Sequence, residues 1–377
     1  MLAAVVMILQ LRRGRPSARA TGQYVNSVVM WRPSGPALPA TLCEREILCS
    51  ASGQAKHLLV AYVAPPVKVR VKVGQGPQTG GRARTRGHVL PLLLRGDSRG
   101  NNSYPRDVIG RSFEVTSDDG THFPVTDEGE GRPVLIVHPG GGTSQAWALV
   151  ARRLTAHFRV LRFDRRPYRP SGGETPMESM AGEVADVLAV ASAVGERLLL
   201  VGHSSGAVVA LEAAVASPGA FAGLALYEPP VAVSSPLCGD ALRRAREAIA
   251  NQEPGRAMTI HLREIVRMPG YQVVLLRLVV PLWDGMKKVA ASQIADDAEL
   301  ESLGVGIDRY SDLNVPTLLV GGARSPRHLR MRLDSLREVL PRVDAVVILK
   351  RQGHIANIRA PWKLAAIIEG FATSTLG

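Results

Sequence analysis

From residue 111 onward, short apolar segments alternate with helix-forming segments, and this alternation limits the folds open to the chain. The segments typical of strands are 133–138, 159–164, 197–201, 221–227, 317–320 and 344–349, and those typical of helices are 144–157, 177–194, 207–216, 327–340 and 361–372. Strands that alternate with helices form βαβ units, in which the strands are parallel and helices cover both faces of the sheet. The sequence therefore predicts an α/β fold with a mostly parallel sheet.

A turn signal stands before the first of these units. Asp118-Asp119-Gly120 separates two strand-like segments, 111–117 and 121–125, and this pattern predicts an antiparallel hairpin at the start of the sheet. Because proline has no backbone N–H to donate, Pro124 predicts that the second of these strands lies at an edge.

The alternation breaks between residues 227 and 317, where the chain is mostly helix-forming. The helix-like segments there are 241–250, 256–267, 271–283 and 287–300. A helical insertion between two strands of one sheet is best interpreted as a lid over a site. We therefore expect a core of residues 111–230 and 315–377 and a lid of residues 231–314. Apolar lid residues at helical spacing, Met258, Met268, Tyr271 and Trp283, suggest an apolar pocket, although such residues more often belong to a core.

Positive charge is concentrated in residues 1–110, which carry sixteen Lys and Arg against four Asp and Glu, whereas residues 111–377 carry thirty against twenty-nine. Gly, Pro and Ser are frequent there and aromatic residues are few, so we expect a basic, poorly ordered N-terminal extension. A tether to nucleic acid or another acidic surface, and a small folded module with strands at 56–63 and 67–73, are the alternatives. The balanced charge of the remainder makes nucleic acid an unlikely partner of the core.

Location is inferred from the N-terminus and the cysteines. The apolar stretch 1–11 is too short to span a bilayer and lacks preceding basic residues, and we predict no membrane span. The three cysteines, Cys43, Cys49 and Cys238, are odd in number and define no disulfide framework. Pairing of Cys43 with Cys49 is one option, but a reduced cytoplasmic setting is the simpler expectation.

A candidate nucleophile lies between the strand-like segment 197–201 and the helix-like segment 207–216. The sequence there is Gly202-His203-Ser204-Ser205-Gly206, a G-x-S-x-G pattern at a strand-to-helix turn, which is typical of a nucleophile elbow. The glycines leave room for a tight turn, and the helix N-terminus favours a developing oxyanion. Gly96-Asp97-Ser98-Arg99-Gly100 has the same pattern, but a loop sequence follows it and not a helix. We therefore predict that Ser204, and not Ser98, is the nucleophile.

Five motifs in this order and spacing resemble the α/β-hydrolase fold family from residue 111 to the C-terminus. They are His138-Pro139-Gly140-Gly141-Gly142, Phe163-Asp164-Arg165-Arg166, the elbow, Tyr227-Glu228-Pro229-Pro230 and Gln352-Gly353-His354. The resemblance implies an eight-stranded, mostly parallel sheet flanked by helices. It also implies a Ser-His-acid triad that works through an acyl-enzyme, with no cofactor and no metal.

His354 is the expected general base, because it follows the strand-like segment 344–349 in a loop at the edge where the elbow should lie. We expect His203, His261 and His328 to be lid or packing residues. The family's oxyanion hole combines the amide after the nucleophile with one from the loop after an early strand, which gives Ser205 and Gly140 here. Pro139 has no amide, and Gly141 is the alternative to Gly140.

The triad acid departs from the family's usual pattern. Most members carry an aspartate where this chain has Gly321-Gly322-Ala323-Arg324-Ser325-Pro326, which contains no carboxylate. Relatives such as the haloalkane dehalogenases take the acid from the end of the preceding strand, and that position is Glu228. The alternatives are Asp312 or another carboxylate, a dyad supported by water or Ser325, and a degenerate site. Asp164, at the end of a central strand, is expected to brace the Arg165-Arg166 turn.

These motifs together predict a serine hydrolase that acts on a small or medium acyl ester or a related acyl substrate. Ser204 attacks, His354 transfers the proton, Glu228 orients His354, and the amides of Ser205 and Gly140 bind the oxyanion. The absence of the usual aspartate leaves one alternative, a non-catalytic protein of this fold that binds a small ligand or partner. A third hypothesis makes the basic extension a nucleic-acid tether. The sequence does not define the oligomeric state.

Overall fold

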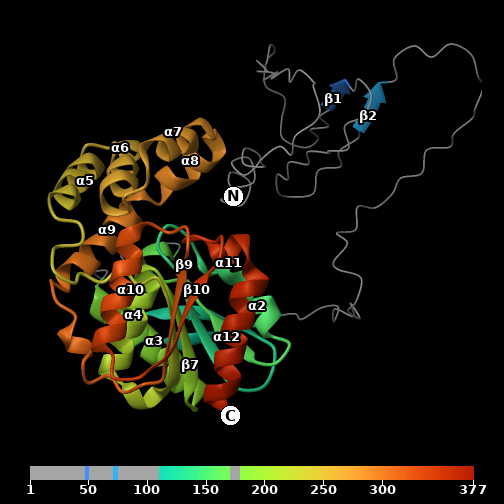
Figure 1. Ribbon diagram of the computed structural model, residues 1–377, viewed down its shortest axis with the longest axis vertical. Coiled ribbons are helices and arrows are strands. Elements are labelled where there is room, and N and C mark those ends of the chain that lie inside the picture. Colours follow the sequence, from blue (N-terminus) through green and yellow to red (C-terminus); the bar gives the residue numbers. More distant parts are fainter. Residues whose placement is uncertain (1–46, 51–70, 75–109, 170–178) are drawn as a thin grey trace, which may run out of the picture. The chain divides into compact units, whose positions relative to one another are not determined.

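The computed structural model describes residues 47–50, 71–74, 110–169 and 179–377 (Figure 1). The chain divides into two compact units, Leu2–Tyr104 and Pro105–Gly377. In the first unit, β1 (Ile47–Ser50) pairs in parallel with β2 (Val71–Gly74). β2 overlaps the strand expected at 67–73, while the strand expected at 56–63 and the pattern around Ser98 lie outside the described residues.

The second unit is built on one eight-stranded sheet with the order β10-β9-β8-β7-β5-β6-β4-β3. Its strands are β3 (Arg111–Thr116), β4 (His122–Glu128), β5 (Pro133–Val137), β6 (Arg159–Arg162), β7 (Leu198–His203), β8 (Phe221–Tyr227), β9 (Thr317–Gly322) and β10 (Val343–Leu349). β4 is antiparallel to both β3 and β6, and the other pairs are parallel. The predicted eight-stranded, mostly parallel sheet with an antiparallel start is confirmed.

The expectation that the strand containing Pro124 lies at an edge is wrong. β3 is the edge strand, and β4, which contains Pro124, lies between β3 and β6. The physical reason is the short overlap between β4 and β6. Pro124 pairs with Glu114 of β3, whereas β6 pairs only with residues Thr126 to Glu128 of β4. The proline therefore lies beyond the stretch that β6 contacts, and no ladder bond to β6 is lost there.

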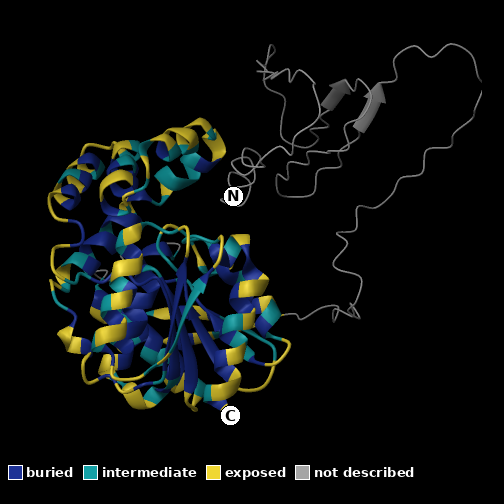
Figure 2. Ribbon diagram, in the orientation of Figure 1, coloured by how far each residue is buried: buried dark blue, intermediate teal, exposed yellow. Residues whose placement is uncertain are grey.

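Helices cover both faces of the sheet, as the apolar strands require. One face packs against α3 (Met180–Val194), α4 (Ser205–Ala216) and α10 (Arg327–Val339), and the other against α2 (Ala148–Leu154) and α12 (Pro361–Leu376). Within β5, Leu135 belongs to the first core and Ile136 to the second. Every residue of β5 and β7 is buried, which is expected when both faces are covered (Figure 2).

Between β8 and β9 the chain forms the helical insertion. Its helices are α5 (Asp240–Ala250), α6 (Pro254–Ile260), the π-turn η4 (His261–Ile265), α7 (Gly270–Leu278), α8 (Val280–Lys288) and α9 (Ala290–Ser302). Figure 1 shows α5–α8 grouped at one end of the core, with α9 leading back to it. The single helix expected at 271–283 is divided at Val279, whose φ and ψ are −92° and 81°, and Pro281 lies in the first turn of the helix that follows.

The apolar residues singled out in the insertion do not line one common pocket. Met258 is buried in α6, whereas Tyr271 of α7 is 65% exposed. Large apolar side chains are exposed along α7 and into α8, namely Tyr271, Val274, Leu275, Leu278 and Val280. Across the residues that the structure describes, no helix combines the length and the hydropathy needed to cross a membrane.

Candidate active site

Ser204 occupies the sharp turn between β7 and α4. Its φ and ψ are 54° and −127°, a left-handed conformation that is strained for a residue with a side chain. The flanking glycines are required by close approach of backbone. A Cβ on Gly202 would lie 2.5 Å from the Cα atom of Ala207, and one on Gly206 would lie 2.3 Å from the carbonyl oxygen of His138. The turn therefore has the geometry that the G-x-S-x-G pattern predicted.

His354 and Glu228 are hydrogen-bonded to each other. The His354 Nδ1 atom lies 2.6 Å from Glu228 Oε2, and Glu228 Oε1 accepts a hydrogen bond of 2.7 Å from the Gly322 backbone amide. The Glu228 side chain is 1% exposed and the His354 side chain 28%. Because the carboxylate accepts at Nδ1, the proton resides there and Nε2 is left with a free lone pair. This is the arrangement that a general base requires.

Glu228 directly follows β8 and, like Ser204, has a positive φ, here 49°. Arg351, in the loop that leads to His354, is another non-glycine residue with a positive φ, here 64°. Strained residues of this kind persist only where the surroundings hold them, and they concentrate at functional sites.

The loop after β9 supplies a backbone amide in place of a carboxylate. A Cβ on Gly322 would lie 2.7 Å from both the carbonyl oxygen of Gln352 and the Cα atom of Gly353, so this loop packs directly on the loop that carries His354. Ser325 Oγ is buried and has no hydrogen-bond partner within the described part of the chain. Asp312 is exposed and precedes the start of β9, at the opposite end of that strand from Gly322. Neither side chain forms a hydrogen bond or ion pair with His354, whose side-chain polar partner among the described residues is Glu228.

His203 and Tyr227 pack against the loop that carries His354 and form hydrogen bonds with its backbone. The His203 ring stacks on Tyr227 with 4.5 Å between ring centroids and lies 4.8 Å from the His354 ring. Its Nε2 atom donates a hydrogen bond of 2.9 Å to the His354 carbonyl oxygen, and burial holds its pKa well below the usual range. The Tyr227 hydroxyl donates to the Gly353 carbonyl oxygen. His203 is thus a packing residue, as expected from sequence.

His261 and His328, which were also expected to be lid or packing residues, lie farther along the chain. His261 is buried in the insertion with its Nδ1 atom 2.6 Å from Asp297 Oδ2, which fits the expected packing role. His328 is half-buried in the first turn of α10, which belongs to the core and not to the insertion.

The loop after β5 is held by a neutral His138. Burial lowers the pKa of His138 to about 4. Its Nε2 atom accepts a hydrogen bond of 2.9 Å from the Arg165 amide, and its Nδ1 atom donates one of 2.7 Å to the Pro139 carbonyl oxygen. A protonated ring could not accept from the Arg165 amide, so the fold requires the neutral form.

The structure brings Gly140 and Ser205 against the same side chain, Asp296 of α9. A Cβ on Gly140 would lie 2.8 Å from Asp296 Oδ2, 2.7 Å from Gln293 Oε1 and 2.9 Å from the Tyr168 hydroxyl. Ser205 begins α4, and its hydroxyl donates a hydrogen bond of 2.8 Å to Asp296 Oδ2. Gly140 therefore lies in a space that only a glycine fills without displacement.

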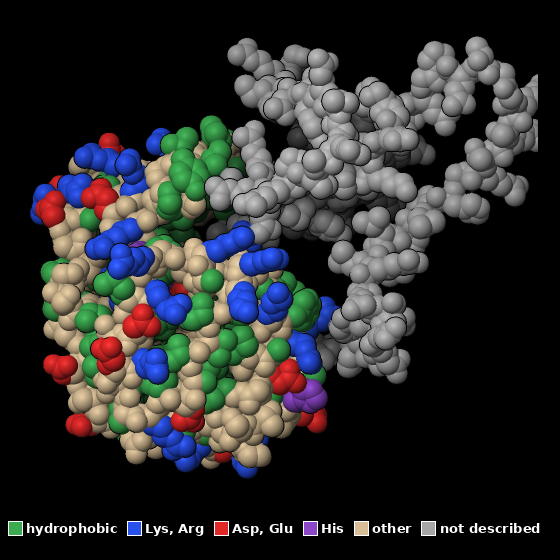
Figure 3. Space-filling model, viewed as in Figure 1, with side chains coloured by type: hydrophobic (Ala, Val, Ile, Leu, Met, Phe, Trp, Pro, Cys, Tyr) green, Lys and Arg blue, Asp and Glu red, His purple; other side chains and the backbone are tan. Residues whose placement is uncertain are grey.

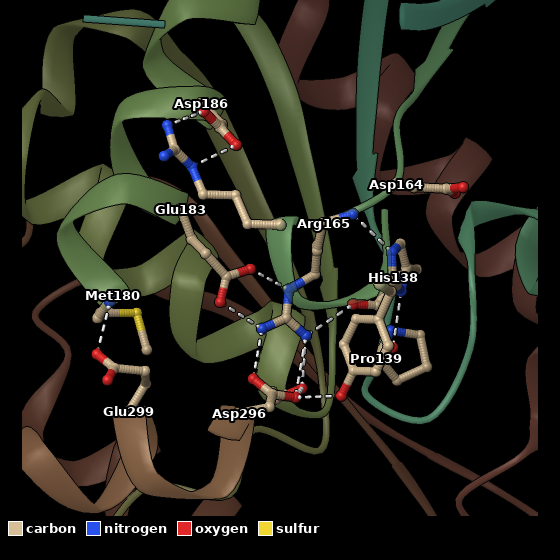
Figure 4. Close-up of polar contacts among 12 residues, drawn as sticks. His138, Pro139, Asp164, Arg165, Met180, Glu183, Asp186, Asp296 and Glu299 are labelled. Carbon is tan, nitrogen blue, oxygen red and sulfur yellow. Dashed lines mark hydrogen bonds and ion pairs between the residues drawn. The ribbon is translucent and has the colours of Figure 1, made fainter. Parts of the chain in front are cut away.

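Arg165 is the centre of a buried polar network (Figure 4). The guanidinium, 1% exposed, contacts Glu183 of α3 at 2.6 and 2.8 Å and Asp296 of α9 at 2.6 Å, and it donates a hydrogen bond of 2.7 Å to Ser205 Oγ. Burial alone opposes the charge of Arg165, but Asp296 and Glu183 raise its pKa well above the usual range. The network joins the elbow, the loop after β5 and the end of the insertion.

The comparison with known proteins now decides the family. Residues 134–365, more than half of the chain, match the model of the alpha/beta hydrolase family. The chain belongs to this family. The solved structure of an alpha/beta hydrolase from Sphaerobacter thermophilus is 31% identical in sequence, with a TM-score of 0.61, and the match covers 69% of this chain and 99% of that one.

Two curated relatives of this hydrolase share a name, pimeloyl-(acyl-carrier protein) methyl ester esterase. The protein from Edwardsiella ictaluri is 37% identical over 93 residues, which are 25% of this chain and 34% of that protein. The protein from Methylococcus capsulatus is 38% identical over 108 residues, which are 27% of this chain and 39% of that protein. The hydrolase thus spans little more than a third of the length of these curated relatives.

Sequence reasoning missed the role of Arg165 in this alpha/beta hydrolase. Asp164 was expected to brace the Arg165-Arg166 turn, but its side chain accepts a hydrogen bond of 2.7 Å from the Ser144 amide and points away from Arg165 (Figure 4). One signal was present in the sequence. Glu183 lies on the buried face of the largely apolar helix α3, and an acidic residue there requires a cationic partner.

Proposed function

We propose that this chain is a serine hydrolase that cleaves a small or medium acyl ester, or a related acyl substrate, through a Ser204–His354–Glu228 triad. The 2.6 Å contact between His354 Nδ1 and Glu228 Oε2 carries the proposal. This contact supports the proposal because a serine nucleophile needs a base whose imidazole tautomer is fixed, and a buried carboxylate fixes it. The strained turn at Ser204, at the end of the neighbouring strand, adds to this support.

In the proposed reaction, His354 Nε2 takes the proton of the Ser204 hydroxyl as Oγ attacks the acyl carbon. The backbone amides of Ser205 and Gly140 bind the oxyanion of the tetrahedral intermediate, with Gly141 as the alternative to Gly140. The carbon–oxygen bond to the alcohol then breaks, and His354 returns the proton to the leaving oxygen. Water, activated by His354, hydrolyses the acyl-enzyme and regenerates Ser204. Glu228 stabilises the imidazolium in both halves of the reaction.

The proposal also assigns roles to whole segments. Residues 231–314 are the lid of the site, and residues 111–230 and 315–377 are the catalytic core. Residues 1–110 are a basic N-terminal extension. A small-molecule acyl substrate and a cytoplasmic setting complete the proposal, and the free, buried thiol of Cys238 is compatible with a reducing compartment.

A fluorophosphonate probe tests whether Ser204 is an activated nucleophile. The wild-type protein should be labelled, and mass spectrometry should place the adduct on the peptide that contains Ser204. The S204A variant should not be labelled, while S98A, which removes the serine of the second G-x-S-x-G pattern, should react like wild type. If the wild-type protein remains unlabelled beside a serine esterase that reacts, the proposal fails and the non-catalytic, ligand-binding alternative takes its place.

A further inference from the structure

Arg332 of α10 is a half-buried arginine without an acidic partner among the residues that the structure describes. None of the carboxylates in the described parts of the chain forms an ion pair or hydrogen bond with it. Burial and the nearby charge of Arg267 lower its pKa to about 10. By contrast Arg330, on the exposed side of the same helix, lies 3.5 Å from Asp334. A partly desolvated charge without a counter-ion costs free energy, and such groups are candidates for ligand binding.

Two further basic side chains, the half-buried His328 and the exposed Arg267, are near enough to Arg332 to interact with it electrostatically. His328 precedes it by four residues and therefore shares its face of α10, which is half-buried at both positions. Arg267 comes from the insertion, in the connection between η4 and α7, and has a positive φ of 57°. Burial, followed by the charges of Arg332 and Arg267, lowers the pKa of His328 to about 4. His328 is therefore neutral at pH 7, and the two guanidinium groups supply the charge.

This cluster adjoins the candidate triad. A Cβ on Gly321 would lie 2.7 Å from the Leu333 side chain of α10 and 3.6 Å from Glu228 Oε1, so α10 packs directly beside the proposed acid. His354 and Glu228 are also among the groups that influence the pKa of His328. Figure 3 shows several Lys and Arg side chains near α10 and α11 (Ala356–Arg359), where the core meets the insertion.

We infer that Arg332 and Arg267, with the ring of His328, form a subsite for an anionic oxygen group, a carboxylate or a phosphate, on the substrate. The substrate class is then an acyl ester that carries an acidic group in addition to its scissile bond. The inference rests on the proposed function. Guanidinium groups suit this role because their fixed N–H pairs match carboxylate and phosphate oxygens and remain charged at neutral pH.

Matched esters test the substrate class. Monomethyl adipate and methyl hexanoate differ by a carboxylate in place of a methyl group, and the readout is the ratio of their kcat/KM values. We expect the wild-type enzyme to prefer the anionic ester, and R332M and R267M each to lower the ratio about tenfold, which is the loss of one hydrogen bond to a charged group. R332K should lie between wild type and R332M, and the matched control R330M should keep the wild-type ratio. Equal ratios for wild type, R332M and R330M would overturn the subsite while leaving the hydrolase proposal intact.

A binding measurement separates the subsite from catalysis. Calorimetry on the S204A variant with adipate and with methylphosphonate reports both anion chemistries without turnover. Binding that weakens about tenfold in S204A/R332M but not in S204A/R330M supports the subsite, even if no ester is hydrolysed. The ligand that binds more tightly shows whether the subsite prefers a carboxylate or a phosphate-like group. Undetectable binding of both anions, or an affinity that R332M does not change, would contradict the proposed subsite.

Stability gives an independent check. Without a bound anion, R332M should melt at a higher temperature than wild type, because it removes a charge without a partner. A lower melting temperature would mean that Arg332 has a structural role.

Discussion

Asp296 of α9 and Arg165 of the loop after β6 form a buried ion pair, with 2.6 Å between Oδ1 and Nη2 and both side chains at most 1% exposed. The pair joins the last helix of the insertion to the core, beside His138 and Ser205. Separating them would take the Asp296 carboxylate away from its counter-charge, while Arg165 would keep Glu183, so α9 remains in place with the core. Any opening of the proposed lid therefore involves α5–α8.

We expect R165M to destabilise the protein far more than D296N. Arg165 neutralises two buried carboxylates, those of Glu183 and Asp296, and R165M leaves both without a counter-charge. The expected cost is about 3–5 kcal/mol in the free energy of unfolding. D296N leaves the Arg165–Glu183 pair charge-balanced and should cost less than half as much. Urea denaturation measures both values, and an equal loss in the two variants would contradict the charge balance described here.

The buried His138 predicts a loss of stability in acid. Its pKa is about 4 in the folded protein and 6.5 in the unfolded chain, so between these values the unfolded state binds more protons. Stability should therefore fall as the pH decreases from about 6.5 to about 4, by about 3 kcal/mol from this residue. In H138Q, where the amide oxygen can still accept from the Arg165 amide, the fall should be smaller. Denaturation curves at pH 7 and pH 4.5 test this, and parallel losses in wild type and H138Q would argue against it.

The elements of the core were predictable because their residues follow local rules. The predicted strand at 221–227 coincides with β8, since an uninterrupted apolar run bounded by loop residues fits a strand covered on both faces. The divided helix at Val279 was not predicted, because the apolar pattern continues through that position and only Pro281 indicates a helix start. Boundaries of this kind depend on tertiary packing.

The candidate site was predictable to a different extent at each residue. The sequence favours Glu228 through the resemblance to relatives that take the acid from the end of the preceding strand, and in the structure His354 lies against it. The network around Arg165 was not predictable as a whole. It joins residues of α3 and α9 that are more than a hundred positions apart, and no local pattern indicates which acidic side chain meets which arginine.

Two glycines of one loop provide a test of the proposed oxyanion hole. A Cβ in G140A would collide with Gln293, Asp296 and Tyr168, whereas a Cβ in G142A would meet nothing within 4 Å. We expect G140A to lower kcat about 10²-fold or more, because displacement of the loop removes an oxyanion donor. G142A should retain nearly full activity. Similar activities for the two variants, with both proteins folded by circular dichroism, would exclude Gly140 from this role.

The central claim, that Glu228 is the acid of the triad, is tested most directly by the kcat of E228Q on a neutral ester. A glutamine can still accept from the Gly322 amide, but its NH₂ group faces His354 Nδ1 and favours the tautomer with the proton on Nε2, which cannot act as a base. We predict a loss of about 10³- to 10⁴-fold in kcat. S325A serves as the control for the alternative dyad and should behave like wild type. An E228Q enzyme within a few-fold of wild type would contradict the account.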